Sequence, residues 1–138
     1  MTQTKSEGVT YKPYTGSYRW SEAATYCNNE GAFLAKIKNK DDIGKARQAF
    51  IPHFDSYWVG VKYDESLNDF VWVDDTPVVS NPNFEAIVNR DEQGEQGLPK
   101  RCLYVTNNGD VLVADGCNEH KMYICQVGES DDPVTTSK

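Results

Sequence analysis

Four cysteines are the residues of this sequence whose type and spacing point most directly to a chemistry: Cys27, Cys102, Cys117 and Cys125. A zinc site would require close pairs such as C-x2-C, whereas the two nearest cysteines, Cys117 and Cys125, are eight residues apart. Neither His53 nor His120 stands at the spacing of a C2H2 site. We therefore predict disulfides, for which three pairings are possible, and hence an oxidising compartment.

The sequence lacks the motifs of common hydrolases, since it contains neither G-x-S-x-G nor H-E-x-x-H. Gly94 and Gly97 lack the Lys-Ser/Thr pair of a phosphate-binding loop. His53 follows a proline at the predicted end of a helix and His120 lies in a turn, so we expect both at the surface. Glycosidase chemistry needs two carboxyl groups held on rigid elements, and no predicted element holds such a pair. We predict that the protein is not an enzyme.

An acidic cluster of Asp91, Glu92 and Glu95 is the strongest group of charges in the segment 74–101. That segment carries three of the six prolines, and no regular element is expected in it. A structureless segment of this length inside a compact domain is uncommon and usually functional. The cluster could bind a cation or a basic partner, and the alternative is a solvated loop. We predict that these three residues contact the ligand.

The composition limits the classes of partner. A chain of 138 residues fits one domain. Its 21 acidic and 14 basic residues give a net charge of −7, which argues against nucleic acid and an anionic membrane surface as partners. No stretch approaches the roughly 20 apolar residues of a membrane span, so we expect no membrane insertion. The first eight residues lack the apolar core of a secretory signal.

Two helices are predicted in the first third of the chain. In residues 18–31, apolar residues recur at helical spacing at Trp20, Ala23, Ala24 and Cys27. Gly31 is the expected C-terminal stop. Asn39 has the character of an N-cap, with two aspartates in the first turn behind it, and Pro52 ends the second helix.

Strands are predicted through the rest of the chain, separated by polar turns, at residues 34–37, 57–61, 70–73, 103–105, 111–113 and 122–125. Asn108-Gly109 between two of them is a strong hairpin signal. The three tryptophans, Trp20, Trp58 and Trp72, lie in segments with core patterning, so we expect them in the core rather than stacked on a sugar.

Several of these segments follow the order of a known family: Trp20-Ser21-Glu22-Ala23 before Cys27, Leu34-Ala35-x-Ile37, Trp58-Val59-Gly60-Val61, Phe70-x-Trp72, and the last three cysteines. The sequence resembles the C-type lectin-like domain in its short form with four cysteines. The resemblance implies an α+β fold with two helices flanking small antiparallel sheets, a long irregular loop and two disulfides. It also implies the pairings Cys27–Cys125 and Cys102–Cys117. We expect the domain at 11–126, a flexible N-terminal segment at 1–10 and a disordered polar tail at 127–138.

Lectins of this family hold Ca²⁺ with oxygens from an E-P-N or Q-P-D motif in the long loop and from W-N-D before the third cysteine. Aligned on Cys117, the W-N-D positions are Leu112-Val113-Ala114, which carry no side-chain oxygen. A calcium ion requires six to eight oxygens, so we expect no metal at the standard site and no other cofactor. Glu95 and Asp115, which lies one residue late, are the candidate ligands of a shifted calcium site.

These observations predict an extracellular or secreted recognition module whose signal peptide is not present in this chain. It binds a glycan or protein ligand through the long loop, without the standard calcium–sugar site. Two alternatives remain open. One is a calcium-dependent carbohydrate-binding lectin that uses the shifted ligand set, and the other is an acidic structural protein of a matrix, mineral or ice surface.

Overall fold

The structure is a computed structural model that describes residues 9–54, 56–64, 66–67, 69–78, 82–88, 102–107 and 111–128. The strands are β1 (Thr10–Tyr18), β2 (Phe33–Leu34), β3 (Ser56–Asp64), β4 (Asp69–Trp72), β5 (Cys102–Thr106), β6 (Leu112–Asp115) and β7 (Lys121–Val127). The helices are α1 (Trp20–Asn29), α2 (Lys40–Gln48) and α3 (Pro82–Glu85). The predicted domain limits at 10 and 127 stay predictions, because residues 1–8 and 129–138 lie outside the described part.

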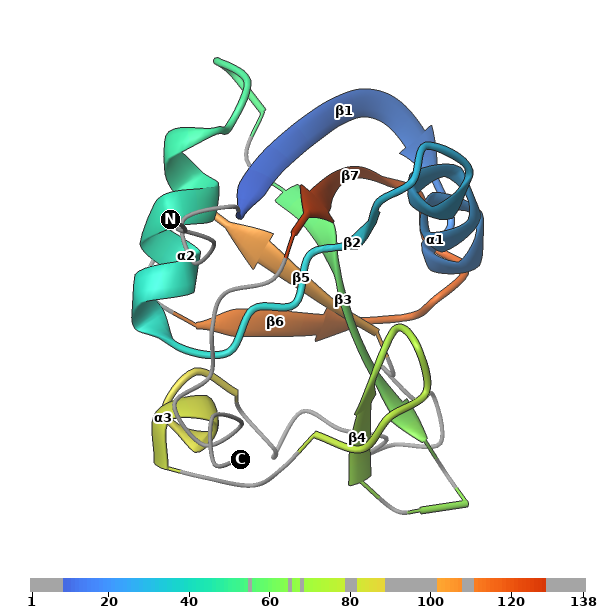
Figure 1. Cartoon of the computed structure of the whole chain (residues 1–138), viewed down its shortest axis with the longest axis vertical. Coiled ribbons are helices and arrows are strands. Elements are labelled where there is room, and N and C mark those ends of the chain that lie inside the picture. Colours follow the sequence, from blue (N-terminus) through green and yellow to red (C-terminus); the bar gives the residue numbers. More distant parts are fainter. Residues whose placement is uncertain are drawn as a thin grey trace, which may run out of the picture.

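One sheet connects all the described strands in the order β1-β7-β3-β5-β6, with β2 added on β7 and β4 on β3. Every pairing is antiparallel except the one between β3 and β7, which is parallel. Figure 1 shows α1 and α2 on opposite sides of this sheet, with α3 next to α2. The predicted α+β fold class is confirmed, and the parallel pairing joins what we expected as separate small sheets into one.

Both long helices begin and end close to where the sequence places them. The Asn39 side chain accepts a hydrogen bond from the Asp42 backbone N–H at 2.9 Å, so it is the N-cap of α2. Gly31 follows α1 with a φ of 76°, a left-handed conformation that glycine adopts without strain. The first helix is shorter than predicted, because Tyr18 belongs to β1 and Arg19 is the N-cap.

The predicted strand at 34–37 is mostly wrong, since only Phe33 and Leu34 pair with β7. Within the described part of the chain, residues 35–37 are joined to the sheet only by isolated hydrogen bonds and form no further ladder. One of these bonds runs from the Gly60 N–H to the Ala35 carbonyl at 2.7 Å. A Cβ atom at Gly60 would lie 2.5 Å from the Leu34 carbonyl oxygen. Glycine is therefore required in β3 for this close approach.

The tryptophans belong to the core, as predicted. Trp20 and Trp58 are buried and Trp72 is half-buried. The Trp20 indole N–H donates to the Val59 carbonyl at 2.7 Å, and that of Trp58 donates to the Tyr18 carbonyl at 2.8 Å. These bonds satisfy the polar atom of each buried indole and fix α1 and β1 against β3.

Both disulfides implied by the resemblance are present. Cys27–Cys125 joins α1 to β7 across 98 residues of sequence. Cys102–Cys117 joins the start of β5 to the turn after β6 across 15 residues. The first bridge closes the whole domain, and the second fixes the point where the chain returns from the long loop.

The prediction of no regular element in 74–101 is wrong for its first half. Val78 is buried after β4, and α3 follows at Pro82–Glu85 with the buried residues Phe84 and Ile87 on one side of it. Proline at the first helical position and apolar residues three apart explain why this segment packs instead of remaining open. In the described residues, no helix is long and apolar enough to cross a membrane.

Candidate functional site

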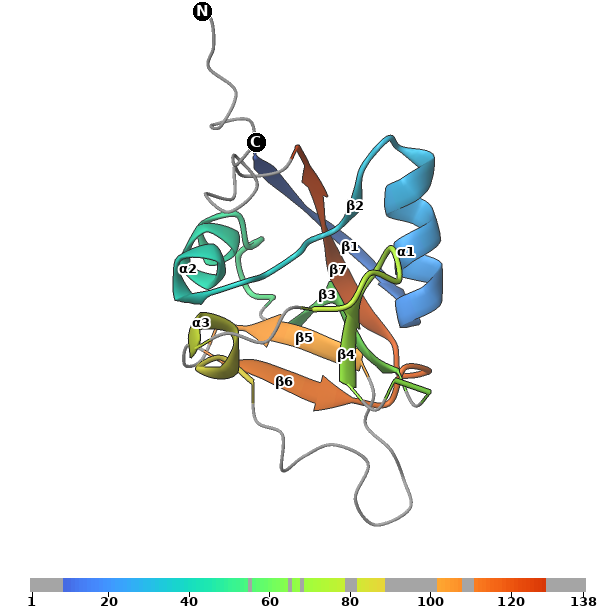
Figure 2. The ribbon, with the colours of Figure 1, turned by 60° about the horizontal axis from the view of Figure 1, so that its bottom comes forward.

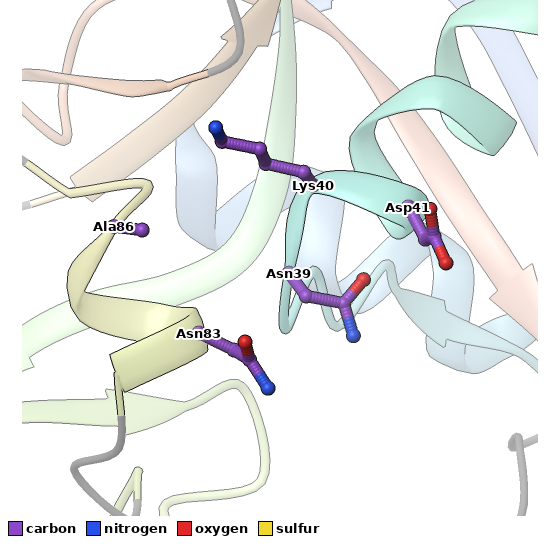
Figure 3. A pocket seen from close by; sticks show the side chains of 5 residues that line it. All are labelled: Asn39, Lys40, Asp41, Asn83 and Ala86. Atoms are coloured by element: carbon purple, nitrogen blue, oxygen red, sulfur yellow. The ribbon is translucent and has the colours of Figure 1, made fainter.

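A groove of about 400 Å³ lies between the N-terminus of α2 and the helix α3. We name it the α2–α3 groove, and its lining residues are Asn39, Lys40, Asp41, Asn83 and Ala86. Figure 3 shows Asn39 and Asn83 on facing sides of the groove, with Lys40 and Asp41 on either side of Asn39. One side of the groove therefore comes from the first half of the predicted ligand-binding segment.

The α2 side of the groove is positioned by the cap of the helix. Because the Asn39 carboxamide oxygen accepts from the Asp42 N–H, the amide nitrogen of the same side chain is left to face outward. Lys40 and Asp41 occupy the first two helical positions and are exposed. The capping bond thus fixes the orientation of one polar side chain, and two charged ones adjoin it.

The α3 side is positioned by its buried face. The Phe84 ring lies 5.9 Å from that of Phe70 and 5.8 Å from that of Trp72, centre to centre. The Ile87 carbonyl accepts a hydrogen bond from the Leu112 N–H at 2.7 Å. With Phe84 and Ile87 turned into the core, the exposed residue Asn83 faces away from it, toward the groove.

The electrostatics of the groove suit a neutral polar ligand. Lys40 and Asp41 carry opposite charges, and two carboxamides supply both donors and acceptors. Within the described part of the chain, the side chains of Lys40, Asp41 and Asn83 make no hydrogen bond or ion pair, so they are available to a ligand. A volume of about 400 Å³ lies within the range of small-ligand sites. The groove can therefore bind hydroxyl or amide groups.

The predicted ligand-contacting residues Asp91, Glu92 and Glu95 lie outside the described residues. The two ends that hold their segment are described. At one end Ile87 is bonded to Leu112, the first residue of β6, and at the other Cys102 pairs with Asp115, the last residue of β6. The segment 89–101 thus leaves and rejoins the described fold at opposite ends of one strand. Its part in binding stays a prediction.

Strand β6 lacks the side-chain oxygens that the standard calcium site requires at its W-N-D positions. Leu112 and Ala114 are buried, and Asp115 alternates with them toward the other face of β6. One Asp115 oxygen accepts from the Lys121 ammonium at 2.9 Å, and the other accepts from the Gly116 N–H at 2.8 Å. Among the described residues no group of three or more His, Cys, Asp or Glu could hold a metal ion. Asp115, a candidate ligand of the shifted site, is therefore engaged within the protein.

Sequence reasoning missed the groove but recorded most of its parts. The sequence patterns mark Asn39 and the two aspartates behind it only as signs of a helix start, and they assign no role to Asn83. The signal that would have revealed α3 is proline followed by apolar residues three positions apart. His53 and His120 are exposed, as expected.

The sequence and the fold are both similar to those of known proteins. The family model of the lectin C-type domain matches residues 16–127. The human C-type lectin domain family 1 member A is 26% identical over 117 residues, which are 84% of this chain and 39% of that protein. The chain spans less than half the length of the curated relatives it matches.

Two solved structures share the fold. The carbohydrate-recognition domain of the mouse scavenger receptor C-type lectin superposes with a TM-score of 0.70 at 14% identity, covering 96% of each chain. The lectin SPL-2 from Saxidomus purpuratus, described as a Ca²⁺-independent C-type lectin, superposes with a TM-score of 0.63 at 21% identity, covering 90% of this chain and 89% of that one.

Proposed function

Because the chain belongs to the family of C-type lectin domains, we propose that it is an extracellular recognition module that binds a glycan or protein ligand without the standard calcium site. Members of this family are non-enzymatic recognition modules, typically extracellular, and related domains bind glycans or proteins. The finer assignment rests on this chain's own residues: the ligand surface is the α2–α3 groove together with residues 89–101, which follow Val88 in the sequence.

The observation that carries the proposal is a set of polar side chains around the groove that make no hydrogen bond or ion pair with the described residues. Asp41 and Asn83 come from segments about 40 residues apart, and tertiary packing brings them to one groove, where they lack partners in the described part of the chain. Because the helices that carry these groups are packed, binding has to order only the side chains and not the backbone.

The calcium-free part of the proposal is supported by β6. Val113 and Ala114 stand where the family's motif supplies two ligand side chains, and Asp115 is bonded to Lys121. Calcium requires six to eight oxygen ligands. A site without these side-chain oxygens must complete the set with water, so its affinity for calcium falls. SPL-2 is described as Ca²⁺-independent, so this fold is compatible with that property.

The acidic cluster would add attraction for a basic partner. Asp91 follows Val88 by three residues in the sequence, and Val88 adjoins Ile87, whose carbonyl is bonded to the start of β6. A protein ligand with basic side chains beside the neutral polar groups that the groove suits would be attracted by these charges and would associate faster at low salt.

The test is a screen of glycan and protein arrays, run once with calcium and once with a chelator. A ligand found in both conditions is then measured against Asn83→Ala and Asn29→Ala. The first variant removes a groove carboxamide, and the second removes an exposed one from the end of α1. We expect Asn83→Ala alone to weaken binding, about three- to tenfold.

Binding that requires calcium would contradict the calcium-free part of the proposal. Equal effects of the two variants would contradict the groove. A chain that binds neither array in either condition would favour the structural alternative, for which adsorption to a mineral or ice surface is the direct measurement.

A further inference from the structure

A second, smaller cleft of about 220 Å³ lies between α1 and the turn that follows β4. We name it the α1–β4 cleft, and its lining residues are Ala24, Thr25, Asn28, Phe33, Val73 and Asp74. Figure 2 shows the turn after β4 beside α1, and α3 on the other side of the molecule. No residue of this cleft belongs to the α2–α3 groove.

The floor of the cleft is apolar and contains an aromatic ring. Ala24, Phe33 and Val73 supply it, from three different segments of the chain. The Phe33 ring is held in place from one direction by the Lys36 ammonium, which lies 5.4 Å from the ring centre. A ligand in this cleft therefore needs one apolar surface of about the size of a single ring.

The rim carries a carboxylate whose orientation is fixed. One Asp74 oxygen accepts from the Thr76 N–H at 3.1 Å and from its hydroxyl at 2.6 Å, and the other accepts from the Lys36 ammonium at 3.1 Å. Burial opposes the charged form of Asp74, but the bonds from Thr76 and Lys36 outweigh it and lower the pKa to about 2. The oxygen bonded to Lys36 has a second acceptor position left for a ligand.

Two further rim groups complete the hydrogen-bonding set. The Thr25 hydroxyl donates to the Ser21 carbonyl at 3.1 Å, so its oxygen remains an acceptor. The Asn28 carboxamide makes no hydrogen bond within the described residues, so it offers donors and an acceptor. The Lys36 side chain is only 11% exposed, and its ammonium already compensates the charge of Asp74.

This combination selects the chemical class of the ligand. The compensated charge leaves no net attraction for an anion or a cation. The polar rim opposes a purely apolar ligand, because its desolvated groups would stay unpaired. A saturated ring with hydroxyl groups on its edge satisfies both surfaces, since its C–H face covers Phe33 while its hydroxyls meet Thr25, Asn28 or Asp74. The volume, below the range of drug-sized pockets, admits a single ring.

We propose that the α1–β4 cleft is a second binding site that takes a neutral polyhydroxyl ring of monosaccharide size, independently of calcium and of residues 89–101. The site goes beyond the recognition surface proposed above, because it shares no residue with it. Single-ring ligands in a site of this size bind weakly, with a Kd on the order of millimolar. Such a site contributes to affinity when a branched or repeating ligand reaches both places on one domain.

The experiment is a titration of the ¹⁵N-labelled protein, in the presence of a chelator, with three probes: methyl α-D-mannopyranoside, methyl β-D-glucopyranoside and methyl β-D-galactopyranoside. We expect at least one probe to give saturable shifts of the Asn28 side-chain amide and of the Thr25 and Phe33 backbone amides. Shifts of those groups that never saturate, or no shifts there with any probe, would overturn the inference.

Matched variants separate specific binding from a general effect on the helix end. Asn28→Ala should weaken the probe about three- to tenfold, as expected for one or two lost hydrogen bonds. Asn29→Ala, the neighbouring exposed carboxamide outside the cleft, should leave the Kd within about twofold. Thr25→Val keeps the side-chain shape and should weaken the probe by a smaller factor. Equal effects of Asn28→Ala and Asn29→Ala would overturn the site.

The two proposals fail separately. Probe shifts confined to Asn39, Lys40 and Asn83 would refute the α1–β4 cleft and support the α2–α3 groove. Shifts confined to Thr25, Asn28 and Phe33 would support the cleft, and the groove would still be judged by the effect of Asn83→Ala on the array ligand.

Discussion

The ammonium of Lys121 lies 2.9 Å from a carboxylate oxygen of Asp115 and 4.1 Å from the centre of the Tyr104 ring. It also lies 5.3 Å from the centre of the Trp58 ring, and its side chain is only 14% exposed. A half-buried cation thus joins the end of β6 to the start of β7, across the turn that contains Cys117. The same contact engages the one acidic residue of β6.

We predict that Lys121→Met lowers the free energy of unfolding by about 1–3 kcal/mol, since it leaves Asp115 without its cation and removes the contacts with two rings. A double-mutant cycle with Asp115→Asn should give a coupling energy of about 0.5–2 kcal/mol. Urea denaturation at neutral pH measures both quantities. A coupling energy of zero would mean that the pair adds nothing to stability.

Calcium should have little effect on stability. We predict that millimolar Ca²⁺ raises the melting temperature by no more than about 2 °C, because a metal stabilises the fold only where its concentration exceeds its Kd for the native state. Differential scanning fluorimetry with calcium, magnesium and a chelator is the measurement. A large rise specific to calcium and abolished by the chelator would show a site built with residues outside the described part, of which Glu95 is the candidate.

Asp42 should make stability depend on pH. Burial raises the pKa of Asp42 above the usual range, and the negative charge of Asp41 raises it further. The hydrogen bond from the Lys38 N–H and the positive charge of Lys45 lower this pKa, but by less. Between the ordinary pKa and the raised one, the folded state binds more protons, so this residue's contribution to stability falls as pH rises.

Asp42→Asn does not titrate, so its stability relative to the wild type should increase as pH rises from about 3.5 to 7. Urea denaturation across that range gives the difference. Asp41→Asn removes the same charge from an exposed position one residue away; it removes only the smallest contribution to the raised pKa of Asp42, so as the control it should change the pH dependence much less. A relative stability of Asp42→Asn that declines with pH would show that the charged carboxylate is favoured in the fold.

The first half of the segment 74–101 should contribute to the stability of the hydrophobic core through α3. We predict that Phe84→Ala destabilises the protein by about 3–5 kcal/mol, since the ring is 1% exposed and packs on Phe70 and Trp72. Asn83→Ala, one residue earlier and exposed, should stay within about 0.5 kcal/mol of the wild type. A small effect of Phe84→Ala would mean that α3 is not required for stability.

The contrast between α2 and α3 shows what sequence alone could predict. Asn39 and Gly31 mark helix ends through local hydrogen bonding and backbone conformation, so their roles could be predicted from short segments. The helix α3 has four residues, so its local signal is limited to a proline and one pair of apolar residues three positions apart, and its place is set by contacts with Phe70 and Trp72.

The α2–α3 groove could not be predicted for the same reason. Its two sides, at Asn39 and Asn83, are 44 residues apart, and no local pattern relates them. The cysteine pairing became predictable only through the family resemblance, since spacing alone left three choices. The engagement of Asp115 by Lys121 depends on a turn geometry that the sequence does not encode in a motif.

The last prediction concerns the acidic cluster. Replacing Asp91, Glu92 and Glu95 together with Ala should leave the melting temperature nearly unchanged, because exposed charges contribute little to stability. Binding of a basic ligand should weaken about three- to tenfold at low ionic strength, and its salt dependence should fall, since fewer charges attract the ligand.

A matched control replaces Glu129, Asp131 and Asp132 with Ala, which changes the net charge by the same amount near the C-terminus. Surface plasmon resonance at several salt concentrations measures both properties. An unchanged affinity and salt slope in the first variant would make the cluster a solvated face, and ligand contact would then be sought at Tyr63 and the Asp64–Asp69 turn. A loss shared equally by both triple variants would assign the effect to net charge alone, because long-range attraction depends on the total charge as well as on its position.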